Sequence, residues 1–201
     1  MSFKHKKMQN SSNNLKWAAL FSQTGSEICN LSEKLGRYPD LVITDNTNIN
    51  NTIDERIELN CNKVLWCNYR NLSKEEKVLY YTKHLNNYDI ITLHGWLNIV
   101  PPEVCNAYSI YNGHPGLINF YPDLKGKDPQ VRAWGDIKKY NYIGSVVHKV
   151  TPGVDEGPII CFSKRFACDA DSLDEVYDIL KETSLDTWVD FFNNSRYNNI
   201  C

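Results

Sequence analysis

The sequence has no apolar run that approaches the roughly 20 residues of a membrane-spanning helix. Basic residues near the N-terminus are not followed by an apolar stretch, so a secretory signal is not expected. Charge of one sign is not in excess either, because the formal net charge is −2 and both signs are interspersed. These absences predict a cytoplasmic protein whose main partner is neither nucleic acid nor a membrane.

The cysteines show no metal-ligand spacing. They are Cys29, Cys61, Cys67, Cys105, Cys161, Cys168 and Cys201, and no two of them form a Cys-x-x-Cys pair. The spacings of a zinc site and of a redox-active dithiol are therefore missing. Several cysteines have apolar neighbours, where a free thiol behaves as a small core side chain. We expect reduced thiols and no metal site.

Residues 1–14 have few apolar side chains and are rich in Asn, Ser and Lys. Such a segment cannot bury enough apolar surface to fold, so we predict a disordered polar tail. The rest of the chain, 15–201, shows no internal repeat or linker. It is long enough for one sizeable core, and we predict a single catalytic domain.

Short apolar runs alternate with helical patterns through the first half of the chain. Strands are predicted at 17–22, 41–44, 63–66, 88–93 and 109–111, and helices at 25–35, 53–59, 73–85 and from 101. Strands that are apolar along their whole length are typical of a parallel sheet covered by helices on both faces. The second half has β-rich runs at 142–149 and 159–166, a short helix at 129–134 and a long helix from 172. We predict a Rossmann-like α/β fold with a mostly parallel central sheet and a β-rich C-terminal part.

Three Ser/Thr-x-x-Glu patterns predict where helices begin. They are Thr24 with Glu27, Ser73 with Glu76, and Ser172 with Glu175. In such a capping box the hydroxyl and the carboxylate each accept a hydrogen bond from a backbone N–H. The first pattern predicts a helix that starts at Gly25.

The stretch at 109–118 reads SIYNGHPGLI, in which a strand is expected to end at Asn112. The following Gly-His-Pro-Gly sequence bends the backbone, and no strand is expected to include it. Asp155 lies in a second Pro- and Gly-rich run, 150–158, after another predicted strand. Ligands of such sheets bind beyond the carboxyl ends of the strands. We predict that Asn112, His114 and Asp155 meet in space and handle a one-carbon group.

These residue types suit transfer of a formyl group to an amine, which passes through a tetrahedral intermediate bearing an oxyanion. The Asn112 amide can donate to that oxygen. The His114 imidazole can donate to it when protonated, or assist removal of the amine proton when neutral. Asp155 can orient the imidazole, raise its pKa and relay protons through water. The alternative is that Asp155 is only a turn residue.

The chain has four other histidines. His5 and His84 are expected to face solvent. His148 lies within a β-rich run, where a hydrogen-bonded core histidine is favoured over a neighbour of the active site. His94 ends a predicted strand, and the sequence leaves open whether it faces the ligand crevice or the core.

Two motifs resemble the signatures of a known family. NGHPGLI at 112–118 and VVHKVTPGVDEGPII at 146–160 are similar to those of the folate-dependent formyltransferases, especially the branch that formylates glycinamide ribonucleotide (GAR). The resemblance covers 16–192 and includes the first strand, turn and helix, the LHGWLNIV segment and the terminal helix. It implies that Asn112, His114 and Asp155 are the catalytic residues.

The resemblance also implies a co-substrate, 10-formyltetrahydrofolate, and no metal. Its pterin ring would be wedged among Leu97, Ile99, Val100 and backbone polar groups, with the glutamate end pointing outward. The implied contacts are Leu97, Asn98, Ile99, Val100, Val150, Thr151 and Val154.

The turn that would bind the acceptor departs from the family pattern. The GAR branch has a Gly-rich turn ending in Ser-Asn, whereas this chain has Gln-Thr-Gly-Ser-Glu at 23–27. Thr24, Gly25 and Ser26 can still bind a phosphate, because a helix N-terminus offers free N–H groups and a favourable dipole. Glu27 either opposes an anion there or simply caps the helix.

Two further positions concern the substrates. Glu182 matches a family position that contacts the ribose of the acceptor. Asn98 stands where the GAR branch has an arginine, which removes one positive charge near the substrates. The predicted function is transfer of a formyl group from 10-formyltetrahydrofolate to the primary amine of a small acceptor, with GAR, and hence purine biosynthesis, placed first. The alternatives are an amino-sugar nucleotide or another small amine as acceptor, a folate-binding protein without transferase activity, and a hydrolase that releases formate.

The length of the chain bears on the branch of the family. It stops soon after its last predicted helix, whereas the initiator methionyl-tRNA formyltransferases add a C-terminal β-barrel. A tRNA acceptor is therefore disfavoured, and the expected partners are a small amine and folate. The sequence predicts no oligomeric state.

Overall fold

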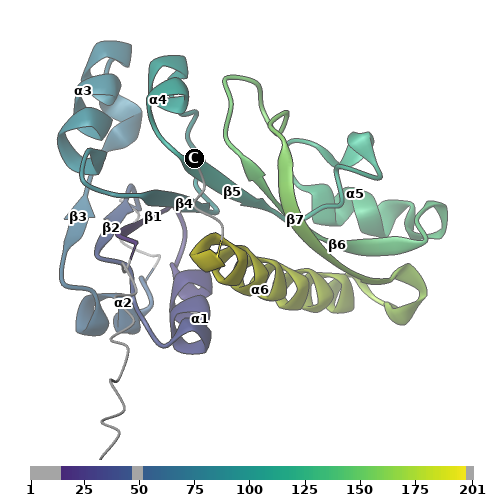
Figure 1. Ribbon diagram of the computed structural model, residues 1–201. Coiled ribbons are helices and arrows are strands. Elements are labelled where there is room, and N and C mark those ends of the chain that lie inside the picture. Colours follow the sequence, from purple (N-terminus) through teal and green to yellow (C-terminus); the bar gives the residue numbers. More distant parts are fainter. Residues whose placement is uncertain (1–14, 47–51, 198–201) are drawn as a thin grey trace, which may run out of the picture.

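The computed structural model describes residues 15–46 and 52–197, so the tail predicted at 1–14 lies outside the described residues. One seven-stranded sheet in the order β3-β2-β1-β4-β5-β6-β7 forms the centre of the molecule (Figure 1). The strands are β1 (Trp17–Phe21), β2 (Leu41–Thr44), β3 (Val64–Trp66), β4 (Ile90–His94), β5 (Ile110–His114), β6 (Tyr142–Lys149) and β7 (Ile159–Phe166). The strands from β1 to β5 pair in parallel. Strand β6 pairs antiparallel with both of its neighbours, β5 and β7. The predicted mostly parallel sheet with a β-rich C-terminal part is confirmed.

Helices cover both faces of the sheet. They are α1 (Ser26–Leu35), α2 (Glu55–Asn60), α3 (Lys74–Leu85), α4 (Pro102–Ala107), α5 (Pro129–Gly135) and α6 (Leu173–Tyr197). Figure 1 shows α1 and α6 on one side and α3 and α4 on the other. Alternate residues of β1 reach the two layers, since Ala19 and Phe21 pack with α1 and α6, whereas Ala18 and Leu20 pack with α3 and α4. Burial on both faces is the reason that these strands are apolar along their whole length.

The capping box predicted for α3 forms in full, and the one predicted for α6 forms in half. At α3, Ser73 Oγ accepts from the Glu76 N–H at 3.2 Å, and the Glu76 carboxylate accepts from the Ser73 N–H at 2.7 Å. At α6, Ser172 Oγ accepts from the Glu175 N–H at 3.2 Å. The Glu175 carboxylate accepts from Asp171 instead of Ser172, so only half of the second box forms as predicted.

The strand β5 extends further than predicted. The expectation that the strand stops at Asn112 is wrong, because the ladder with β6 continues to His114, opposite Val146. Hydrogen bonding and packing against the neighbouring strand hold these residues extended in spite of their local tendency to turn. Gly113 is required there, since a Cβ would lie 2.7 Å from Nε1 of Trp188 in α6.

Within the described ranges, no helix combines the length and the apolar character that crossing a membrane requires. The cysteines described are free thiols, and Cys29, Cys61, Cys67 and Cys105 are buried. The part of the chain that the structure describes holds no group of three or more His, Cys, Asp or Glu side chains placed to bind a metal ion.

Candidate active site

Asn112 and His114 lie on the same face of β5, because side chains alternate along a strand. The opposite face points to α6, where the ring of Tyr111 lies 4.7 Å from that of Phe191. His148 of β6 is the cross-strand partner of Asn112, and its Nε2 lies 3.2 Å from Asn112 Nδ2. Two imidazoles and one amide therefore gather at the carboxyl end of β5, on the side of the sheet away from α6.

Asp155 reaches this group from the loop that joins β6 and β7. Its Oδ2 lies 3.4 Å from His114 Nδ1, and its Oδ1 lies 3.3 Å from His148 Nε2. The Gly126 N–H donates to Oδ2 at 2.9 Å and holds the carboxylate in place. The structure thus brings Asn112, His114 and Asp155 together and adds His148 to them.

Three backbone features lie in this loop or beside it. Asp155 has a φ of 53°, in the left-handed region that Asp adopts more readily than most side chains. Gly157 passes so close to Lys149 that a Cβ would lie 1.7 Å from the Lys149 carbonyl oxygen. The register of β6 and β7 also shifts between Val147 and His148, as is common beside active sites. These features direct Asp155 back toward β5.

The electrostatics of the group favour a neutral imidazole beside an ionised carboxylate. Burial lowers the pKa of His114, and Asp155 opposes this only in part. Burial would raise the pKa of Asp155, but its contacts with His148 and His114 outweigh burial and lower the pKa to about 2. Leu124 O lies 2.9 Å from His114 Nε2, and a carbonyl oxygen can only accept, so Nε2 carries the proton of the neutral ring. The free nitrogen of His114 is then Nδ1, which faces Asp155.

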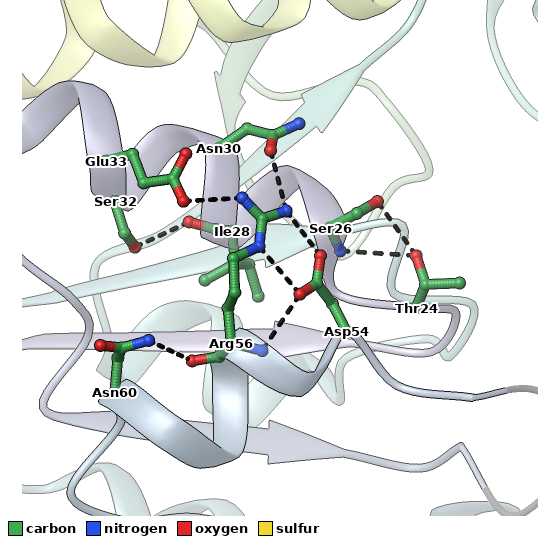
Figure 2. Close-up of polar contacts among 9 residues, drawn as sticks. All are labelled: Thr24, Ser26, Ile28, Asn30, Ser32, Glu33, Asp54, Arg56 and Asn60. Carbon is green, nitrogen blue, oxygen red and sulfur yellow. Dashed lines mark hydrogen bonds and ion pairs between the residues drawn. The ribbon is translucent and has the colours of Figure 1, made fainter.

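The turn between β1 and α1 presents two hydroxyl groups. Thr24 Oγ1 and Ser26 Oγ lie 3.0 Å apart, and the Ser26 N–H donates to Thr24 Oγ1 at 3.4 Å. Figure 2 shows that the guanidinium of Arg56 is turned toward Asp54 and Glu33, with N···O distances of 2.6 and 2.8 Å. The positive charge of Arg56 is therefore paired within the protein and is not directed at the two hydroxyls.

Glu27 does not cap α1, so the capping box predicted from Thr24 and Glu27 is wrong. Gly25 is the N-cap, and no side chain caps the helix. The Glu27 carboxylate instead lies 2.7 Å from His94 Nδ1 and accepts from Ser184 Oγ at 2.5 Å. Burial would raise the pKa of Glu27, but these contacts lower it. An ionised carboxylate thus lies in the first turn of α1 and opposes the binding of an anion.

His94 is a core histidine and does not face the ligand crevice. Its Nε2 lies 2.9 Å from Thr92 Oγ1, which also accepts from Trp17 Nε1 at 2.7 Å. Its ring lies 4.6 Å from the ring of Trp188. With Glu27 at Nδ1, both ring nitrogens have partners. His94 therefore holds the Glu27 carboxylate in the protein interior, next to the turn between β1 and α1.

Glu182 does not face the turn between β1 and α1. Its carboxylate pairs with Arg165 of β7 at 3.0 Å, and Asp186 pairs with the same guanidinium at 2.9 Å. Ser184, which binds Glu27, is two positions further along, and successive residues of an α-helix are about 100° apart. Glu182 therefore points away from Glu27. The structure does not bring Glu182 together with the other residues predicted to bind the acceptor, at 24–27.

The segments predicted to hold the donor expose large apolar side chains. Leu97, Ile99 and Val154 are 62%, 67% and 55% exposed. Val100 is buried in the same apolar cluster against which Val150 packs, so the two segments lie together. Exposed apolar side chains on two adjacent segments could cover one face of a flat ring such as a pterin.

Asn98 binds a residue that the sequence did not single out. Its Nδ2 donates to Asp45 Oδ2 at 2.6 Å, and Arg70 Nε lies 3.9 Å from the same oxygen. Asp45 Oδ1 is buried and has no hydrogen-bond partner within the described ranges. Asn98, which stands in place of the family's arginine, therefore links its loop to the end of β2.

Thr151, the other polar residue predicted to contact the donor, makes a local contact, with Oγ1 3.5 Å from Gly153 O.

For His148 the sequence favours a hydrogen-bonded core histidine and keeps a neighbour of the active site as the alternative. The side chain is indeed buried, but it contacts Asn112 and Asp155. The motif VVHKV could have drawn attention to it, yet the contact depends on the register of β5 and β6, which no local pattern encodes.

A sequence profile of the family described as "Formyl transferase" matches residues 5–190. Two curated relatives are both described as phosphoribosylglycinamide formyltransferase. That of Dictyostelium discoideum is 28% identical over 100 residues, which are 47% of this chain and 48% of the relative. That of Bacillus subtilis (strain 168) is 29% identical over 94 residues, which are 46% of each chain. The chain thus matches about half the length of these relatives.

The fold is similar to that of solved structures. The crystal structure of phosphoribosylglycinamide formyltransferase from Anaplasma phagocytophilum matches with a TM-score of 0.75 and 19% identity, over 91% of this chain and 87% of that one. At this identity the likeness concerns the fold, including the mixed sheet with helices on both sides.

Proposed function

Because this chain belongs to the formyl transferase family, we propose that it transfers a formyl group from 10-formyltetrahydrofolate to the primary amine of glycinamide ribonucleotide. The observation that carries the proposal is the convergence of Asn112, His114 and Asp155. The two curated relatives support the choice of acceptor, since both are described as phosphoribosylglycinamide formyltransferase. We propose cytoplasmic action, in keeping with the free thiols of the described cysteines.

The proposed reaction uses one amide, one base and one carboxylate. The acceptor nitrogen attacks the formyl carbon, a C–N bond forms, and the carbonyl electron pair moves to oxygen. Asn112 donates an amide N–H to this oxyanion. Neutral His114 accepts the proton of the attacking nitrogen at Nδ1, directly or through one water, and ionised Asp155 stabilises the resulting imidazolium. His114 then returns the proton to N10 of the donor as the carbonyl re-forms and the C–N10 bond breaks.

The donor is proposed to lie on the apolar side chains that the protein leaves exposed. Leu97, Ile99 and Val154 would cover its pterin ring, with Val100 and Val150 as the floor. Bound donor would bury these side chains, which contributes about 1.5 kcal/mol for each large apolar side chain removed from water.

Substitution Leu97→Asp tests the donor site. We expect KM for 10-formyltetrahydrofolate to rise about tenfold, because the apolar contact is lost and a charge is placed against the ring. We expect kcat to change little, since Leu97 is not among the reacting groups. Leu79→Asp is the matched control, because Leu79 is 68% exposed on α3. An unchanged KM in Leu97→Asp would place the donor elsewhere.

A second acceptor class is favoured by the first turn of α1. The phosphate of GAR would lie at Thr24, Gly25 and Ser26, where N–H groups and the helix dipole attract an anion. The ionised Glu27 carboxylate opposes that attraction, and the paired Arg56 does not compensate for it. An amino-sugar nucleotide, or another small amine without a phosphate at this turn, is therefore the second candidate.

Substitution Glu27→Gln distinguishes the two acceptor classes. If a phosphate binds at the turn, removal of the like charge should lower KM for GAR about fivefold, corresponding to about 1 kcal/mol. An acceptor without a phosphate there should show no such gain. Glu75→Gln is the control, because Glu75 lies in the first turn of another helix, α3.

The function itself is tested by donor consumption. Purified protein is mixed with 10-formyltetrahydrofolate and with GAR, a panel of amino-sugar nucleotides, or water alone. The proposal expects an N-formyl product and tetrahydrofolate in equal amounts. Binding of a folate analogue without any product would indicate a folate-binding protein, and formate released without an amine would indicate a hydrolase. Either result would overturn the proposal.

A further inference from the structure

Arg132 of α5 is joined to the catalytic cluster through a single backbone atom. Its Nη2 donates to Leu124 O at 3.1 Å, and the same oxygen lies 2.9 Å from His114 Nε2. A carbonyl oxygen has two lone pairs, so it can accept from the guanidinium and from the imidazole at once. The place of the Leu124 carbonyl therefore depends on Arg132 and helps to determine where the His114 ring is held.

Arg132 also binds two other carbonyls of the same loop. Its Nη2 donates to Lys125 O at 2.7 Å, and its Nη1 donates to Lys127 O. A guanidinium presents five N–H donors in a rigid plane, so one side chain can hold several carbonyls in a fixed relation. Between these carbonyls lies Gly126, whose N–H donates to Asp155 Oδ2 at 2.9 Å. The loop that Arg132 binds thus contacts both members of the proposed base and carboxylate pair.

Packing of the loop's own side chains does little to hold it in place. Gly126 has a φ of 83°, in the left-handed region that favours glycine. Apart from its chain neighbours, a Cβ built there would meet no atom of the described residues within 4 Å. The side chain of Lys127 is 92% exposed. Polar contacts must therefore determine the conformation of the loop, and Arg132 makes three of them.

We propose that Arg132 is a positioning residue, which fixes the loop at 124–127 so that His114 and Asp155 are held in the geometry for proton transfer. The inference rests on the proposed function, since it takes His114 to be the base. Arg132 is exposed, so its replacement removes the three contacts without opening a cavity in the core.

The first test replaces Arg132 by Met, which keeps the length of the side chain but donates no hydrogen bond. We expect kcat to fall about 10- to 100-fold, because a small displacement of a catalytic group has an effect of this size. KM for the donor should stay near that of the wild type, since the apolar side chains at 97–100 are unchanged. Arg132→Lys should lose less, because its ammonium can still donate to part of the carbonyl set. A raised KM with unchanged kcat would contradict the inference.

The matched control is Arg37→Met. Arg37 also donates to a backbone carbonyl, Leu15 O at 2.8 Å, but it lies after the end of α1. Its kcat should equal that of the wild type. Equal losses in Arg37→Met and Arg132→Met would indicate a general effect on the folded protein and would overturn the inference.

The second test asks through which residue Arg132 acts. In the His114→Ala background, Arg132→Met should cause little further loss of kcat, because the base that the loop positions is already absent. The same fold loss in the wild-type and His114→Ala backgrounds would show that Arg132 acts independently of His114, which contradicts the inference.

The third test does not depend on activity. Amide hydrogen exchange followed by NMR should show the Gly126 N–H exchanging about tenfold faster in Arg132→Met than in the wild type, because its loop opens more often. The Ile91 N–H, which donates to Ser109 O at 3.1 Å within the sheet, should exchange at the wild-type rate. Unchanged exchange at Gly126 would refute the inference even if the enzyme transfers formyl groups. Absence of transfer by the wild type would instead refute the proposed function, and exchange at Gly126 would still show whether Arg132 holds the loop.

Discussion

Replacement of His114 by alanine is expected to lower kcat for formyl transfer about 100- to 10,000-fold, the range that a positioned general acid or base contributes. The imidazole is the one group in the cluster that is proposed to accept and return the proton. KM for the donor should change little, because the apolar side chains at 97–100 and 150–154 remain. Steady-state kinetics at saturating GAR and donor measure the effect.

The matched control is His84→Ala. His84 lies on α3, where its ring lies 4.6 Å from that of Tyr80, so the same substitution is made far from the cluster. Its kcat should equal that of the wild type. Near-normal turnover by a folded His114→Ala variant would remove His114 from the mechanism.

The pH dependence of kcat follows from the pKa of the same side chain. Burial lowers the pKa of His114 below 6.5, and the base is active when neutral. The wild type should therefore gain activity as the pH rises, with the midpoint of the rise below pH 6.5. In Asp155→Asn the carboxylate that raises this pKa is missing, so the remaining activity should reach its plateau at a lower pH. A shift to higher pH would contradict this assignment.

The second large effect is expected for Asp155→Asn, which should lower kcat about 100- to 1,000-fold. The substitution keeps the shape of the side chain but removes the charge that stabilises the imidazolium of His114, and such electrostatic terms are large in a buried site. Asp128→Asn is the matched control, because Asp128 also has a left-handed backbone, with a φ of 51°, but lies on the surface. The control should keep full activity.

Asp155 should also contribute to stability in acid. Its pKa is about 2 in the folded protein and about 3.8 ordinarily, so the unfolded chain binds the proton more readily. The stabilisation, about 2 kcal/mol, should be present above pH 3.8 and be lost as the pH falls toward 2. Denaturant unfolding of the wild type and Asp155→Asn at several pH values measures it. The difference in the free energy of unfolding should shrink in acid, and a constant difference would speak against the ionised carboxylate.

Much of the fold was predictable because its signals are local. Burial of both sheet faces makes each central strand apolar along its length, as in Leu41–Thr44, and this pattern is readable one segment at a time. The capping box of Ser73 and Glu76 spans four residues and forms wherever a helix starts there. The similar pattern at Thr24 and Glu27 failed because the interior offered the carboxylate better partners, His94 and Ser184.

The site was predictable only in part, for a related reason. The sequence identified Asn112, His114 and Asp155 because they lie in Gly- and Pro-rich segments at the ends of predicted strands. In the structure these three residues lie in one cluster. That His148 lies opposite Asn112 follows from an antiparallel register set by the whole of β5 and β6.

The sequence by itself determined the order of strands and helices, the family and the three polar residues that the proposed chemistry uses. Tertiary structure alone decided that β5 runs on to His114, that Glu182 points away from the first turn, and that His148 and Asp155 converge on one amide and one imidazole. The physical reason is that hydrophobic periodicity and capping act over a few neighbouring residues. Strand register, helix rotation and partners for buried charges depend instead on contacts between residues far apart in the chain, such as Glu27 with Ser184.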